Sequence, residues 1–162
     1  MHIIITRPKE DSLHIIKNLI KLGHLVTHLP VIKVQKLETE KINLLNYQAV
    51  IFTSSNAIRF MNIEKFNSKI KCFCVGKATE LTARQAGFLN TYTSEGTVDS
   101  LIELIMRTLD SKSGKLLYLS SEFISKDLDK DLIDSGYSVD RISNYTSHPV
   151  EEVDKKTLDF FE

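Results

Sequence analysis

The sequence predicts an α/β protein with mainly parallel sheets, and three observations carry that prediction. The run Ala49-Val50-Ile51-Phe52 is apolar and uncharged, which is typical of a strand buried on both faces of a parallel sheet. A polar turn and apolar residues at helical spacing follow this run, and Ile70–Gly87 repeats the same order. The first 29 residues also alternate strand, helix and strand with short connections, which favours parallel pairing with a right-handed crossover.

The amino-terminal segment is predicted to form one β-α-β unit. His2–Thr6 is a β-branched run, and Arg7-Pro8 ends it. Leu13–Ile20 has helical spacing and is followed by Gly23, a typical helix stop. Leu25–Leu29 is the second expected strand, closed by a proline.

The next segment changes character. Val31–Leu37 alternates apolar and polar residues, as a strand with one solvated face does. We interpret it as the first bridge between two domains. Thr39–Leu45, with its acidic start, is expected to be a short helix.

Four polar residues follow the buried strand at Ala49–Phe52: Thr53, Ser54, Ser55 and Asn56. These residue types cap helices, so we expect a helix through Met61. In an open α/β sheet such a turn lies at the carboxyl edge of the strands, where ligands usually bind. Hydroxyls and free backbone N–H groups there favour an anion site, although each hydroxyl taken singly is explained better as a simple cap.

A second strand, Ile70–Val75, leads to the expected turn Gly76–Thr79 and a helix ended by Gly87. Gly76 permits close approach of the backbone, and Lys77 is placed to meet an anion. The alternative is a plain tight turn with a solvated lysine. The spacing excludes a P-loop because the second glycine and the four-residue spacer are missing.

The remaining segments continue the β/α alternation. A helix with an apolar stripe is expected after the cap Thr97, and we assign the whole stripe to the core. Ser120-Ser121-Glu122 is expected to form another polar corner. The expected strands are 88–93, 115–119 and 137–145, and the expected helices are 98–109 and 128–135. The apolar stripe consists of Leu101, Ile102, Ile105, Met106 and Leu109. Thr146–Pro149 is expected to be a polar exit, a loop that leaves the last strand and leads to a helix at Val153–Phe161.

Composition narrows the class of protein. The formal net charge of zero gives no general field for nucleic acid, so none is expected as a partner. No signal-peptide pattern and no run of about 20 apolar residues is found, so we expect a cytoplasmic monomer that binds no membrane. Cys72 and Cys74 are expected to be buried free thiols, and the five scattered histidines do not form a metal site.

Taken together, a series of short segments resembles the uroporphyrinogen-III synthase family. No single segment is specific, but their order and spacing agree throughout the chain. The segments are Ile5-Thr6-Arg7-Pro8, Gly23, Leu29-Pro30-Val31-Ile32, Val50–Ala57, Val75–Thr79, Ala86-Gly87-Phe88, Leu117-Tyr118-Leu119 and Asn144-Tyr145.

The resemblance implies two parallel-sheet, flavodoxin-like α/β domains joined by a two-stranded linker. Residues 1–33 would begin domain 1, residues 34–146 would form a complete domain 2, and residues 147–162 would begin the return into domain 1. The opening strands lack further partners, and the family's second polar corner in domain 1 has no counterpart here. We therefore expect a first domain that is only partly present, either because the chain is cut short or because the gene is degenerate.

The resemblance also implies a lyase of tetrapyrrole and heme biosynthesis that closes hydroxymethylbilane, inverts its ring D and releases water without a metal or organic cofactor. Tyr145 matches the family's tyrosine beside the cleft, as a proton donor or as a packing residue. The alternatives are an inactive fragment or a small anion- or nucleotide-binding α/β module. Expected substrate-binding residues are Thr6, Arg7, Thr53, Ser54, Ser55, Asn56, Lys77, Ala78, Thr79 and Ser120.

Overall fold

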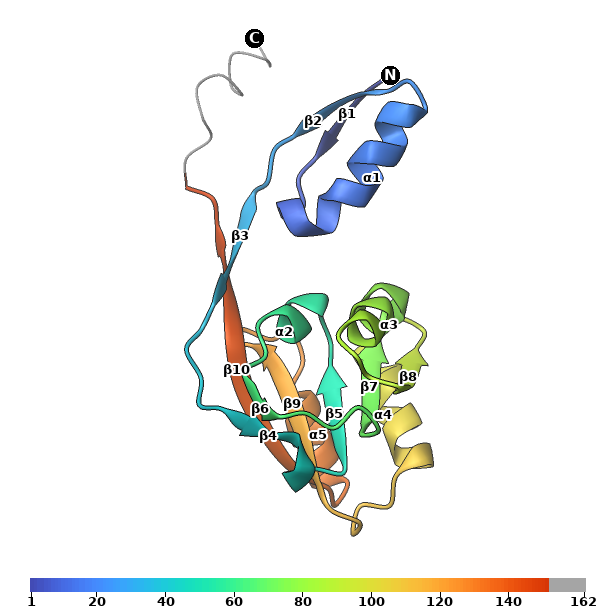
Figure 1. Cartoon of the computed structure of the whole chain (residues 1–162), viewed down its shortest axis with the longest axis vertical. Helices are drawn as coiled ribbons and strands as arrows, with labels where there is room; N and C mark the ends of the chain where they lie inside the picture. The colour runs from blue at the N-terminus through green and yellow to red at the C-terminus, as the bar shows by residue number, and fades with distance from the viewer. Residues whose placement is uncertain (152–162) are drawn as a thin grey trace. The chain divides into compact units, whose positions relative to one another are not determined.

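The structure is a computed structural model that describes residues 1–151. The chain divides into two compact units (Figure 1). Unit 1 contains Met1–Gln35 and the described residues from Ser147 onward, and unit 2 contains Lys36–Thr146. The helix expected at Val153–Phe161 lies outside the described residues.

Unit 1 holds a parallel β-α-β motif, as the sequence predicts. Strand β1 (His2–Ile5) pairs in parallel with β2 (Leu25–His28), and α1 (Lys9–Lys21) connects them. The buried Ser12 hydroxyl donates to the carbonyls of Pro8 at 2.8 Å and Arg7 at 3.1 Å, which ties the first turn of the helix to the end of β1.

Unit 2 is built on five parallel strands. Strand β3 (Ile32–Lys36), of which only Lys36 belongs to unit 2, is hydrogen-bonded beside β10 at one edge of the sheet. The five are β5 (Ala49–Phe52), β7 (Lys71–Val75), β8 (Asn90–Ser94), β9 (Lys115–Ser121) and β10 (Ser138–Pro149). Their order across the sheet is β10-β9-β5-β7-β8, with every neighbouring pair parallel. All four residues of β5 are fully buried, as expected for its central place.

Helices cover both faces of this sheet. On one face α4 (Val98–Thr108) and α5 (Leu128–Asp134) pack Leu101 and Leu132 against Ile51 and Phe73. The other face carries α2 (Ser55–Arg59) and α3 (Gly76–Gln85), and there Phe52 meets Phe88 edge to face with ring centroids 5.6 Å apart. The apolar residues of β5 therefore serve two cores, which is why the run lacks polar alternation.

Counted along the chain, the five parallel strands of unit 2 have the order 3-2-1-4-5. This order differs from the 2-1-3-4-5 order of flavodoxin, so the description as flavodoxin-like holds for the parallel α/β layers of this unit and not for its strand order. The α/β class with a mainly parallel sheet is confirmed. Apolar runs indicate which segments are strands but carry no information on which strand lies beside which.

Several local predictions are wrong. Thr39–Leu45 forms strand β4 (Ile42–Asn43) and the 3₁₀ turn η1 (Leu44–Asn46), because β4 pairs with β6 (Ile63–Lys65) and Asn43 caps η1 through the Leu45 N–H. The expected polar exit at 146–149 continues strand β10, and α2 ends at Arg59 rather than near Met61.

Two predictions about α3 and α4 also need correction. Gly76–Thr79 is the first turn of α3, with Gly76 at a φ of 75°, rather than a separate turn. In the stripe of α4, Leu101 and Ile105 are fully buried, but Met106 is 49% exposed and is not a core residue.

Candidate functional site

The candidate site lies at the carboxyl ends of β5 and β9. These two strands are neighbours in the sheet, yet β7 and β8 come between them in the sequence and lie on the other side of β5. The connections leaving β5 and β9 therefore go in opposite directions, which opens a crevice between them. This topological switch point is where open α/β sheets bind ligands.

A pocket of about 200 Å³ occupies that crevice. Hydroxyls from β9, from β10, from the turn after β5 and from the loop after β9 line it, together with apolar side chains and one lysine. Its lining consists of Thr53, Ser54, Val75, Val98, Tyr118, Ser121, Phe123, Ile124, Ser125, Lys126 and Tyr145. Among the described residues, no carboxylate belongs to this lining, so the pocket suits an uncharged or anionic group.

Tyr118 spans the floor of the crevice from β9 toward β5. Its side chain is only 2% exposed, and its hydroxyl oxygen lies 3.3 Å from Oγ1 of Thr53. Burial raises the pKa of Tyr118 above its ordinary value of 10.0, partly offset by the Thr53 hydroxyl and the Arg141 charge. Tyr118 is therefore a neutral phenol at physiological pH.

Of the two roles predicted for Ser54, helix cap and part of an anion site, the structure shows the helix cap. Ser54 is the N-cap of α2, and its hydroxyl accepts the N–H of Asn56 at 3.2 Å. The same residue lines the pocket, so the cap and the lining are compatible.

Tyr145 reaches the pocket from β10 through an irregularity in that strand. The register shifts between Ser143 and Tyr145, so that Tyr145, not Asn144, stands opposite Ser121. The extra residue, Asn144, is fully buried and donates from Nδ2 to the Ala57 carbonyl of α2 at 2.7 Å. Such bulges frequently redirect side chains beside functional sites.

Lys126 ties one wall of the pocket to two helices. Its ammonium pairs with Asp99 in the first turn of α4 and with Asp131 of α5 at 3.6 Å. The hydrogen bond with Asp99 raises the pKa of Lys126. These two carboxylates partly neutralise the charge of the lysine, which weakens its attraction for an anionic ligand.

Several residues predicted for the site lie outside this pocket. Ser55 donates to the Ala78 carbonyl at 3.4 Å, which links α2 with α3, while the Asn56 amide oxygen accepts from Arg59 at 2.8 Å. Thr79 is only 5% exposed. Ser55, Asn56 and Ala78 therefore hold helices in place in this structure, and Thr79 is a buried residue of α3.

Ser120 is not a corner residue as expected. It lies inside β9, is fully buried, and donates its hydroxyl to the Ser121 carbonyl at 2.9 Å. Arg141 Nε donates to the same hydroxyl at 2.9 Å. The apolar strand simply continues two residues further than its sequence suggests.

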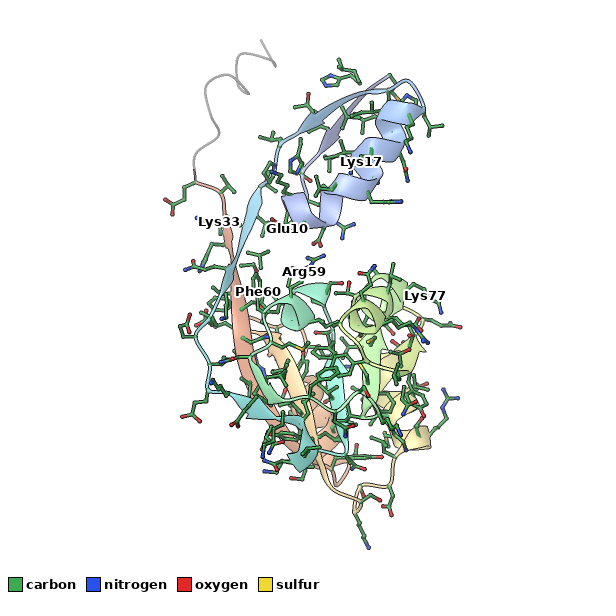
Figure 2. The ribbon with its side chains drawn as sticks, viewed as in Figure 1. Glu10, Lys17, Lys33, Arg59, Phe60 and Lys77 are labelled. Atoms are coloured by element: carbon green, nitrogen blue, oxygen red, sulfur yellow. The ribbon has the colours of Figure 1, made fainter. Side chains whose placement is uncertain are left out.

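Lys77 extends from the first turn of α3 (Figure 2), and its side chain is 88% exposed. Its ammonium pairs with Glu80 at 3.2 Å. It also borders a second hollow of about 500 Å³ at the ends of β7 and β8, lined by Gly76, Lys77, Thr93, Ser94, Glu95 and Gly96. Its lining residue Gly76 directly follows Val75, which lines the candidate pocket.

Thr6 and Arg7 belong to unit 1, where both are exposed after the end of β1. The Arg7 carbonyl accepts from His28 Nε2 at 2.9 Å, and the Thr6 carbonyl accepts from the Val31 N–H at 3.0 Å. Their side chains are thus accessible within that unit.

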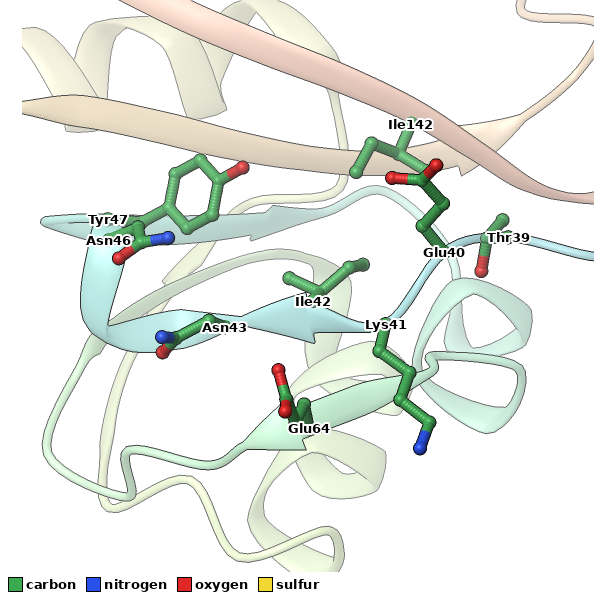
Figure 3. A pocket seen from close by; sticks show the side chains of 9 residues that line it. All are labelled: Thr39, Glu40, Lys41, Ile42, Asn43, Asn46, Tyr47, Glu64 and Ile142. Atoms are coloured by element: carbon green, nitrogen blue, oxygen red, sulfur yellow. The ribbon is translucent and has the colours of Figure 1, made fainter.

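A larger pocket of about 600 Å³ lies beside β4, η1 and β6 (Figure 3). Glu40 and Glu64 line it together with a single lysine, Lys41, and none of the residues predicted for the site is among its described lining. Burial and the neighbouring Asp140 raise the pKa of Tyr47 in this pocket to about 12. An acidic cavity of this kind is a poor place for a polycarboxylate.

The sequence reasoning missed Tyr118, Ser121 and the segment Phe123–Lys126. Tyr118 had a usable signal, because a tyrosine within a buried strand needs a partner for its hydroxyl. The segment 123–126 carried none. Within residues 1–151, no three or more His, Cys, Asp and Glu side chains gather as a metal site, and no helix is long and apolar enough to cross a membrane.

The fold and the pocket define an α/β protein with a ligand crevice at the switch point of a parallel sheet. Residues 14–160 match the family Uroporphyrinogen-III synthase HemD, which is nine-tenths of the sequence. The chain belongs to this family.

Individual relatives are distant. The chain is 24% identical over 168 residues to the Porphyrin biosynthesis protein HemD of Ruminiclostridium josui, covering 95% of this chain and 33% of that protein. It therefore spans about a third of the length of that curated relative.

Two solved structures share the fold. Uroporphyrinogen-III synthetase from Helicobacter pylori gives a TM-score of 0.62 at 16% identity, covering 99% of this chain and 68% of that chain. A mutant uroporphyrinogen III synthase from the extremely thermophilic bacterium Thermus thermophilus gives a TM-score of 0.58 at 16% identity, covering 93% of this chain and 64% of that chain.

Proposed function

We propose that the protein is a uroporphyrinogen-III synthase, a lyase that cyclises hydroxymethylbilane with inversion of ring D and loss of water. Family membership is the observation that carries the proposal. The position of the pocket at the switch point supports it independently, because it gives the family reaction a site within unit 2.

The size of the pocket limits how much of the substrate it can hold. At about 200 Å³ it is smaller than the roughly 300–1,000 Å³ of sites that enclose a whole drug-sized ligand. We infer that it holds one part of the bilane, while other carboxylate-bearing rings lie along the same edge of the sheet toward Gly76 and Lys77. The N-terminus of α3 and the Lys77 ammonium favour carboxylates there.

The reaction needs a proton at the departing hydroxyl. In our proposal a pocket phenol donates it, the C–O bond of the hydroxymethyl group breaks, and the hydroxyl leaves as water. The resulting cation-like carbon is attacked by the ring-D carbon that already carries the bridge to ring C, which forms a spiro intermediate. That bridge bond then breaks and re-forms at the free carbon of ring D, which inverts the ring, and the proton lost from this carbon returns to the phenolate. Tyr145 is the proposed donor, and Thr53, Ser54 and Tyr118 orient the substrate through their hydroxyls.

The proposal keeps the two-domain organisation, in which residues 34–146 form domain 2 and the residues before and after them belong to domain 1. Thr6, Arg7, Ser55, Asn56, Ala78 and Thr79 are retained only as secondary positions, since none lines the pocket. The mechanism does not depend on them.

The test is to incubate hydroxymethylbilane with the full-length natural protein and to separate the uroporphyrinogen isomers. The expected product is the type III isomer, in excess over a protein-free control in which the bilane closes spontaneously to type I. Type I alone in both samples would refute the proposed function. Tyr145→Phe removes the proposed proton donor, and Tyr47→Phe is its matched control, because Tyr47 precedes β5 at the opposite end of the strand.

A further inference from the structure

Arg141 makes an unusual set of contacts at the edge of the candidate pocket. It lies half-buried in β10, and its guanidinium faces the end of β9. Nε donates to the Ser120 hydroxyl at 2.9 Å, and Nη2 donates to the carbonyls of Ser121 at 3.0 Å and Glu122 at 3.1 Å. One side chain thus holds three consecutive residues.

These three residues lie where β9 ends and a wall of the pocket begins. Ser121 and Phe123–Lys126 line the pocket, and residues 122–127 belong to no helix or strand. The backbone of this segment is also held by the Glu122 N–H, which donates to the Tyr145 carbonyl at 2.8 Å. The wall and Tyr145 are therefore connected through the same short stretch that Arg141 holds.

The charge of Arg141 is not used in an ion pair. Among the described residues, no carboxylate lies within ion-pair distance of its guanidinium, and all three acceptors are neutral oxygens. A planar fork can reach acceptors in several directions at once, which a lysine ammonium on a flexible stem cannot reproduce. The residue type thus fits the task of fixing a strand end.

We propose that Arg141 is a positioning residue that fixes the end of β9 and, through it, the pocket wall from Ser121 to Lys126. Its importance for catalysis rests on the proposed function, whereas its effect on the wall does not. Without the guanidinium, the segment loses three hydrogen bonds and opens more often, while the rest of the sheet remains paired.

The first test is amide hydrogen exchange on the full-length protein, comparing wild type with Arg141→Gln and Arg141→Lys. We expect exchange in residues 120–126 to become at least about tenfold faster in Arg141→Gln, with a smaller change in Arg141→Lys and none in β5 or β7. Arg107→Gln is the matched control, since it removes the same charge from an exposed position on α4. Unchanged exchange in 120–126, or an equal increase throughout unit 2, would overturn the proposal.

The second test is the kinetics of bilane closure. Arg141→Gln should lower kcat/KM by at least about tenfold without a matching fall in melting temperature, and Arg141→Lys should recover part of the loss. Full kcat/KM in a variant with a loosened wall would overturn the catalytic part of the proposal. If the wild-type protein itself makes only the type I isomer, the proposed function fails, and the exchange measurement alone still decides the role of Arg141 in the wall.

Discussion

Replacing Glu80 with glutamine tests the electrostatics of the helix that begins beside the pocket. The Glu80 carboxylate accepts from Arg84 at 3.0 and 3.1 Å, from Lys77 at 3.2 Å and from the Thr91 hydroxyl at 3.2 Å. The hydroxyl of Thr93 and the Arg84 guanidinium are the main causes that lower its pKa from 4.5 to about 2. The anionic form is therefore stabilised in the folded state.

The magnitude follows from that pKa. A fall from 4.5 to about 2 corresponds to about 3 kcal/mol of folding free energy if none of it were screened. Lys77 is 88% exposed and Arg84 is 52% exposed, so water screens both ion pairs, and we expect about 1 kcal/mol. Because the folded-state pKa is depressed, this stability is present above pH 4.5 and is lost as the pH falls toward about 2.

Urea unfolding of wild type and Glu80→Gln at neutral pH and at about pH 2.5 measures the effect. The variant should be about 1 kcal/mol less stable at neutral pH, and the difference should shrink at the lower pH. Glu103→Gln, an exposed change on α4, serves as the control and should differ little at either pH. A difference of the same size at both pH values would refute the reasoning.

Three further predictions concern the pocket and the core. Tyr145→Phe should slow formation of the type III isomer by about a hundredfold without unfolding the protein, and full activity would reduce Tyr145 to a packing residue. Asn144→Ala should cost about 1–3 kcal/mol in urea unfolding because it leaves the Ala57 carbonyl unpaired, and a change below about 0.5 kcal/mol would contradict this. Cys72 and Cys74 are fully buried with Sγ atoms 3.8 Å apart, and their mutual hydrogen bond raises the pKa of Cys72. A thiol reagent should therefore label neither cysteine before the protein unfolds. Rapid labelling of the folded protein would disprove this.

Much of the strand pattern could be predicted because buried parallel strands need unbroken apolar runs. The run Ala49–Phe52 became the central strand β5, and Lys71–Val75 became β7 beside it. Short strands without such a run were not predictable. The pairing of β4 with β6 involves Ile42 and Ile63, which are isolated in the sequence, so a charged segment was mistaken for a helix.

The candidate site was predicted only where a local rule applies. Thr53 and Ser54 follow a buried strand, and that position alone places them at the carboxyl edge. Lys126 reaches the pocket from a segment without periodicity, so only the folded chain reveals it. Ser120 was misplaced because two serines after an apolar run resemble a turn, whereas hydrogen bonds to Arg141 and Ser121 allow the strand to bury them.

The three strands around the pocket are held by polar ties rather than by apolar packing alone. Asn144, the extra residue of the β10 bulge, fixes α2 through Ala57, while Tyr145 keeps its place opposite Ser121. Deleting Asn144 would leave Tyr145 as the next residue after Ser143 and thus still in register with Ser121. The deletion should therefore remove the tie to α2 but keep the phenol at the pocket. Loss of activity in that deletion, with retained activity in Asn144→Ala, would mean that the bulge itself, and not its amide, sets the geometry of the site.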